Sequence, residues 1–122
     1  ELRKVYELFP ALKDKAKQKA GTLSGGEAQM LAIGRALMSK PKLLMLDEPS
    51  AGLSPTMVSR ILGTISSIAK DSISVLIVEQ DVGRALSMSA KGYVLENGHV
   101  TQTGTGQELL RDESVKKAYL GL

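Results

Sequence analysis

Apolar residues recur along the chain in a helical period over two long segments. Residues 25–40 and 58–69 follow this period, and Ser24 and Ser54 precede them as candidate N-caps. Glu27 follows Ser24 by three residues, which is the spacing of a capping box, so a helix is predicted to begin at Gly25. Pro55 fits the first turn of the second helix. Shorter helical segments are expected over residues 2–9, 11–20, 82–89 and 106–120.

Continuous apolar runs at residues 43–46 and 75–78 indicate strands that are covered on both faces in a parallel sheet. Asn97-Gly98 is the pair that a type I′ turn requires, and it predicts an antiparallel hairpin of residues 92–96 with 99–103. The alternation of strand and helix before the hairpin predicts an α/β fold with a mostly parallel sheet.

Composition narrows the classes of protein that fit. The chain has 122 residues, which suits one small domain or part of a larger one, and it contains no cysteine, so disulfides and thiolate metal sites are excluded. Sixteen basic and 13 acidic residues are too balanced to indicate nucleic acid as a partner. The basic stretch at residues 13–19 is interpreted as a solvated surface, with docking to a partner or to lipid headgroups as the alternative.

Ser24, Gly25, Gly26 and Glu27 form the first candidate site. Glycines allow close approach to the backbone, Ser24 offers a hydroxyl, and the amides and dipole of a helix start favour an anion. A capped helix preceded by a glycine turn is the simpler interpretation of these residues taken alone.

Asp47 and Glu48 form the second candidate site, because they follow a buried strand at the edge of a parallel sheet where ligands bind. Adjacent residues of an extended strand point to opposite sides, so the two carboxylates are expected to have separate functions. One is suited to hold hydrated Mg²⁺ and the other to deprotonate a water molecule. A charged strand end at the surface is the alternative.

Taken together, these motifs resemble those of ATP-binding-cassette (ABC) transporter ATPases. Residues 23–27 are similar to the family's signature motif, 43–48 to its Walker B strand with the catalytic Glu, 50–54 to its D-loop and 78–81 to its switch segment. Gln80 stands where the family usually has histidine, and it cannot change its charge near neutral pH. This Gln80, together with residues near Phe9 and Asn97, resembles the branched-chain amino acid importers of the LivF type.

The resemblance implies a partial P-loop NTPase fold, with residues 1–40 ending a helical subdomain and 41–122 forming the C-terminal part of a RecA-like core. It also implies ATP and Mg²⁺ as cofactors, with Asp47 as the metal ligand and Glu48 and Gln80 as catalytic residues. Ser24, Gly25, Gly26, Glu27, Ser50 and Gly52 would bind the nucleotide.

Its partners would be a second ATPase subunit and transmembrane permease subunits, reached through the helical segment that includes Tyr6 and Phe9. Such a protein would be cytoplasmic and peripheral on the inner face of the cell membrane.

A Walker A loop, with its Gly-Lys pair, is absent from the chain. Because the chain also begins with Glu1, it is interpreted as a C-terminal half that by itself does not turn over ATP. The missing Walker A strand would leave apolar strand edges open, so pairing with another chain or strand exchange is expected.

Two other functions fit some of the motifs. A DNA-repair or chromosome ATPase would share the signature and Walker B motifs, but long heptad repeats would be expected around them. A cassette remnant that serves only as an interaction module is the non-enzymatic alternative.

Overall fold

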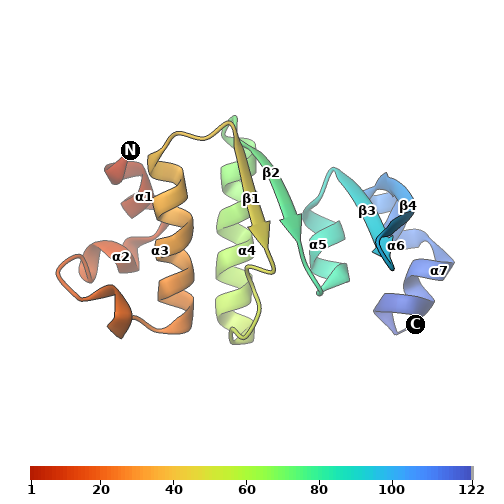
Figure 1. Ribbon diagram of the computed structural model, residues 1–122, viewed down its shortest axis with the longest axis horizontal. Helices are drawn as coiled ribbons and strands as arrows, with labels where there is room; N and C mark the ends of the chain where they lie inside the picture. The colour runs from red at the N-terminus through yellow and green to blue at the C-terminus, as the bar shows by residue number, and fades with distance from the viewer. Residues whose placement is uncertain (122) are drawn as a thin grey trace. The chain divides into compact units, whose positions relative to one another are not determined.

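The computed structural model describes residues 1–121, which form two compact units that divide between Ile77 and Val78 (Figure 1). This division follows the density of contacts along the chain. The boundary between residues 40 and 41, which the family resemblance implies, stays a prediction.

The first unit combines helices with a pair of strands. Its helical segments are α1 (Leu2–Leu8), α2 (Pro10–Asp14), the 3₁₀ turn η1 (Ala20–Thr22), α3 (Gly25–Met38) and α4 (Pro55–Lys70). Strand β1 (Leu43–Asp47) pairs with β2 (Ser74–Val78), whose last residue begins the second unit. The two arrows run in the same direction in Figure 1, with α4 as the crossover. This β-α-β arrangement confirms the predicted α/β fold.

Helix starts follow the capping residues that the sequence predicts. Helix α3 begins at Gly25 with both hydrogen bonds of the Ser24–Glu27 capping box in place. Helix α4 begins at Pro55, and the Ser54 hydroxyl accepts from the Met57 amide at 3.3 Å. Each side chain satisfies an amide that the helix itself leaves without a partner.

The core of the first unit lies among its helices and one face of β1. Helix α3 contacts α1, α2 and α4. Gly34 of α3 allows α1 to approach closely, since an added Cβ would lie 2.8 Å from the Val5 side chain. The buried apolar residues are Val5, Phe9, Leu12, Met30, Ile33, Leu37, Leu44, Ile61, Leu62, Ile65 and Ile68.

The prediction that both strands are covered on both faces is wrong for this chain. Leu44 is 4% exposed, whereas its neighbours Leu43 and Met45 are 52% and 68% exposed, and Leu76 of β2 is 51% exposed. Successive side chains point to opposite faces, and the helices cover only one of them. The other face of the β1–β2 pair is therefore apolar and open.

The second unit is built around an antiparallel hairpin. Strands β3 (Lys91–Glu96) and β4 (His99–Thr105) pair through the Asn97-Gly98 turn, with a bulge next to Leu95. Helices α5 (Val82–Met88), α6 (Gly106–Arg111) and α7 (Glu113–Val115) and the π-helical turn η2 (Lys116–Leu120) complete it. The core contains Leu86, Leu109 and Val115. The predicted hairpin and short C-terminal helices are confirmed.

None of the helices within residues 1–121 has the length and apolar character needed to cross a membrane.

Candidate functional site

The start of α3 presents polar groups on the surface of the first unit. Ser24 and Gly25 are exposed. The Ser24 Oγ accepts a hydrogen bond from the Glu27 amide at 3.3 Å. A hydroxyl that accepts can also donate, so Ser24 can still offer its O–H to a ligand. Together with the amides of the first turn, this hydroxyl suits the binding of an anion.

The two glycines at this helix start differ in their surroundings. A Cβ added to Gly25 would meet only the Leu53 side chain, at 3.7 Å, which is an ordinary contact. A Cβ added to Gly26 would lie 2.5 Å from Met57 Cγ, and Gly26 is buried. Packing within the chain therefore requires glycine at position 26 and leaves the requirement at position 25 unexplained.

Glu27 is held by two hydrogen bonds at the same helix start. Its Oε2 accepts from the Ser24 amide at 3.0 Å, and its Oε1 accepts from Lys15 Nζ at 2.5 Å. The bonds from Lys15 and from the Ser24 amide hold the pKa of this carboxyl below its ordinary value of 4.5. Glu27 is therefore a carboxylate at neutral pH.

Asp47 and Glu48 lie at the end of β1, as predicted. Asp47 is the last residue of the strand and is exposed. Glu48 follows the strand with φ at 47°, a left-handed conformation that is uncommon outside glycine. The alternation of side chains that holds for extended residues does not apply to Glu48. Its backbone instead turns the chain into the following loop, where the Ala51 amide donates to the Glu48 carbonyl at 3.1 Å.

The loop after Glu48 reaches the start of α3. Its turn is closed by the Leu53 amide, which donates to the Ser50 carbonyl at 3.2 Å, and Gly52 supplies a φ of 72°. Leu53 then lies against Gly25, and Met57 in the first turn of α4 lies against Gly26. The structure thus brings the segment after the acidic strand end together with the glycine-rich helix start.

Gln80 lies in the second unit, between β2 and α5, and it is exposed. The next residue, Asp81, caps α5 by accepting from the Arg84 amide at 3.1 Å. The catalytic role of Gln80 stays a prediction.

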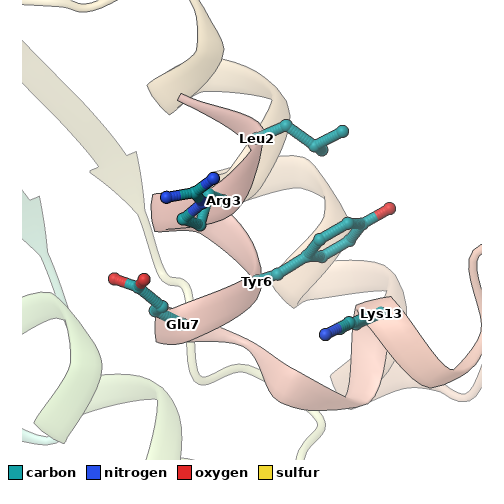
Figure 2. Close-up of a pocket in the computed structure, with 5 residues that line it drawn as sticks. All are labelled: Leu2, Arg3, Tyr6, Glu7 and Lys13. Carbon is teal, nitrogen blue, oxygen red and sulfur yellow. The ribbon is translucent and has the colours of Figure 1, made fainter.

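A shallow pocket on α1 and α2 was not predicted from the sequence as a cavity. Figure 2 shows Leu2 and Tyr6 projecting from one side of α1 and Arg3 and Glu7 from the other, with Lys13 of α2 below the Tyr6 ring. The pocket has a volume of about 500 Å³. Because α1 repeats its polar and apolar residues at helical spacing, the sequence does indicate an amphipathic surface here.

Within the segment that is expected to reach a membrane partner, Tyr6 lines this pocket and Phe9 does not. The Phe9 side chain is 2% exposed, and its φ of −130° interrupts the helix between α1 and α2. The preference for burial of a large aromatic ring explains the difference.

A strand-helix-strand unit with acidic residues at a strand end is the arrangement in which α/β domains bind ligands, at the carboxyl ends of their strands. A family model described as ABC transporter matches residues 1–51. The high-affinity branched-chain amino acid transport ATP-binding protein BraG of Pseudomonas aeruginosa is 52% identical over 121 residues, covering 99% of this chain and 52% of that protein. The probable branched-chain amino acid transport ATP-binding protein LivF of Archaeoglobus fulgidus is 46% identical over 117 residues, covering 95% and 50%.

Comparison of the fold with solved structures also points to ATP-binding cassettes. The crystal structure of a nucleotide-free ATP-binding cassette from an ABC transporter matches with a TM-score of 0.81 and 32% identity, over 99% of this chain and 49% of that one. Over nearly its whole length the chain is similar to ATP-binding proteins of ABC transporters. It spans about half the length of the relatives that it matches.

Proposed function

We propose that the protein containing this chain is the ATP-hydrolysing subunit of a membrane importer for branched-chain amino acids. The observation that carries the proposal is the exposed, capped helix start at Ser24 and Gly25, connected by packing to the loop that follows Glu48. The names of the two relatives, which both refer to branched-chain amino acid transport, support the substrate class.

ATP bound with Mg²⁺ is the substrate, and it lies between this subunit and a second ATPase subunit. Ser24 donates its hydroxyl hydrogen, and Gly25 and Gly26 their backbone amides, to the terminal phosphate of the nucleotide held by the second subunit. The absence of any packing reason for glycine at position 25 supports close approach of a ligand there. Glu27 supports this surface by capping the helix.

The groups at the end of β1 act on the nucleotide held by this subunit. Asp47 has the right donor chemistry for Mg²⁺, a hard cation that in nucleotide sites takes one or two carboxylates together with phosphates and water. Glu48 accepts a proton from the water that attacks the terminal phosphate. Gln80, by the family resemblance, is a further catalytic residue, and Ser50 and Gly52 shape the loop at the subunit boundary.

In this proposal, a permease subunit contacts the ATPase at the pocket on α1 and α2 (Figure 2). This pocket is lined by Leu2, Arg3, Tyr6, Glu7 and Lys13. Its apolar floor and its charged residues suit a short amphipathic helix. Contact with a permease would place the protein on the cytoplasmic face of the membrane.

The experiment is to measure ATP binding and turnover in the complete gene product that contains this chain. Glu48→Gln keeps the size and polarity of the side chain but removes the base. We expect ATP binding to remain within about threefold and turnover to fall by about two orders of magnitude or more. Glu113→Gln, an exposed residue of α7, is the control and should leave both unchanged. Retained turnover in Glu48→Gln would exclude Glu48 as the base.

A further inference from the structure

The charge at the start of α3 depends on a residue outside both candidate sites that the sequence indicates. A helix N-terminus carries roughly half a positive charge. The Glu27 carboxylate lies at this terminus, 3.0 Å from the Ser24 amide, and its full negative charge outweighs that of the dipole. By itself, a helix start of this composition would repel a phosphate.

Lys15 reverses this balance. Its ammonium group lies 2.5 Å from the second carboxylate oxygen of Glu27, and it comes from the segment that follows α2, twelve residues earlier. The Glu27 side chain is 17% exposed and the Lys15 side chain 37%, so the pair is partly shielded from water and salt. With Lys15 in place, the helix start has a net positive charge.

We propose that Lys15 is a positioning residue of the nucleotide site, and this inference rests on the proposed function. Lys15 neutralises Glu27 and holds its carboxylate on the Ser24 amide. The Ser24 hydroxyl and the Gly25 amide then face the terminal phosphate of ATP without a competing negative charge. The lowered pKa of Glu27, caused first by its hydrogen bond from Lys15, agrees with a carboxylate that is charged at neutral pH.

The test compares ATP titrations of turnover in the complete gene product and its variants. In Lys15→Met the carboxylate is uncompensated, and we expect the KM for ATP to rise about three- to tenfold while kcat stays within about twofold, as suits one unscreened charge near a surface. Higher salt should reduce this difference, because screening weakens the repulsion. The double variant Lys15→Met/Glu27→Gln should have a lower KM than Lys15→Met alone, since glutamine keeps the hydrogen bond to Ser24 and carries no charge.

Lys17→Met is the matched control, because Lys17 is exposed in the same segment and takes part in none of the ion pairs found within residues 1–121. Lys15→Arg keeps the charge and should keep the KM, which guards against a folding defect in Lys15→Met.

An unchanged KM in Lys15→Met would overturn the inference, as would a defect that Glu27→Gln and salt do not relieve. Either result leaves the proposed function intact if the unmodified protein hydrolyses ATP. An unmodified protein without ATPase activity would remove the proposed function and this inference together.

Discussion

Glycine serves different purposes at the positions that matter for the site. Gly25 is open towards solvent, Gly26 is covered by Met57, and Gly63 in the middle of α4 has open space where a Cβ would point. Substitution by alanine should therefore have opposite effects on the free energy of unfolding at Gly26 and at Gly63.

Gly26→Ala should lower the free energy of unfolding by about 1–2 kcal/mol, because overpacking against Met57 exceeds the gain in helix propensity. Gly63→Ala should raise it by about 0.5–1 kcal/mol, since alanine restricts the unfolded chain and meets no neighbour. Urea unfolding of the variants measures both. Met57→Ala supplies the control, because the cost of Gly26→Ala should disappear in that background. Equal effects of alanine at positions 26 and 63 would contradict this packing.

At single residues, some features of the site could be predicted from the sequence and others could not. The capping box at Ser24 was predictable because it depends on two residues three positions apart. The Lys15 contact to Glu27 was not, since it joins residues twelve apart whose distance depends on how α2 and α3 pack. The left-handed backbone conformation of Glu48 could not be predicted either, because glutamate rarely adopts a positive φ.

At the scale of elements, the β3–β4 hairpin is the feature that local sequence determines most fully. Asn97 and Gly98 have φ values of 50° and 78°, as a type I′ turn requires. The strand pair β1–β2 is the opposite case. Its apolar runs predict strands correctly, but which faces are covered depends on other segments, and the structure leaves Leu43 and Met45 exposed.

Gly98→Ala should destabilise the protein by about 1 kcal/mol, because a side chain at this positive φ is strained. Asn97→Gly keeps the turn accessible and should stay within about 0.5 kcal/mol of the original. Thermal unfolding of the two variants beside the unmodified chain gives the comparison. If alanine at position 98 were tolerated as well as glycine at position 97, the turn would not have this conformation in solution.

At the scale of the whole molecule, the open apolar face of β1–β2 bears on how the chain exists in solution. Leu43, Met45 and Leu76 are each more than half exposed there. An apolar patch of this kind favours association, which supports the expectation that the isolated chain pairs with another chain. A species that stays monomeric over a wide concentration range in ultracentrifugation would count against this expectation.

The resemblance to ABC transporter ATPases could be predicted from the order and spacing of the motifs, and the comparisons confirm this resemblance. The assembly of a complete nucleotide site could not be obtained in this way, because in the proposed function it takes groups from a second subunit. That assembly is the central claim of the proposed function.

The most direct measurement places a single cysteine at the start of α3 and asks whether the terminal phosphate of ATP reaches it. The chain has no cysteine of its own, so Ser24→Cys introduces one reactive thiol into this part of the protein. In the complete gene product with its partner subunits, we expect an ATP analogue with a thiol-reactive group on its terminal phosphate to label Ser24→Cys, and unmodified ATP to prevent it. Ser39→Cys, exposed at the other end of the same helix, should show only the background labelling of the parent protein. Equal labelling at positions 24 and 39, or labelling at position 24 that ATP does not suppress, would contradict the account.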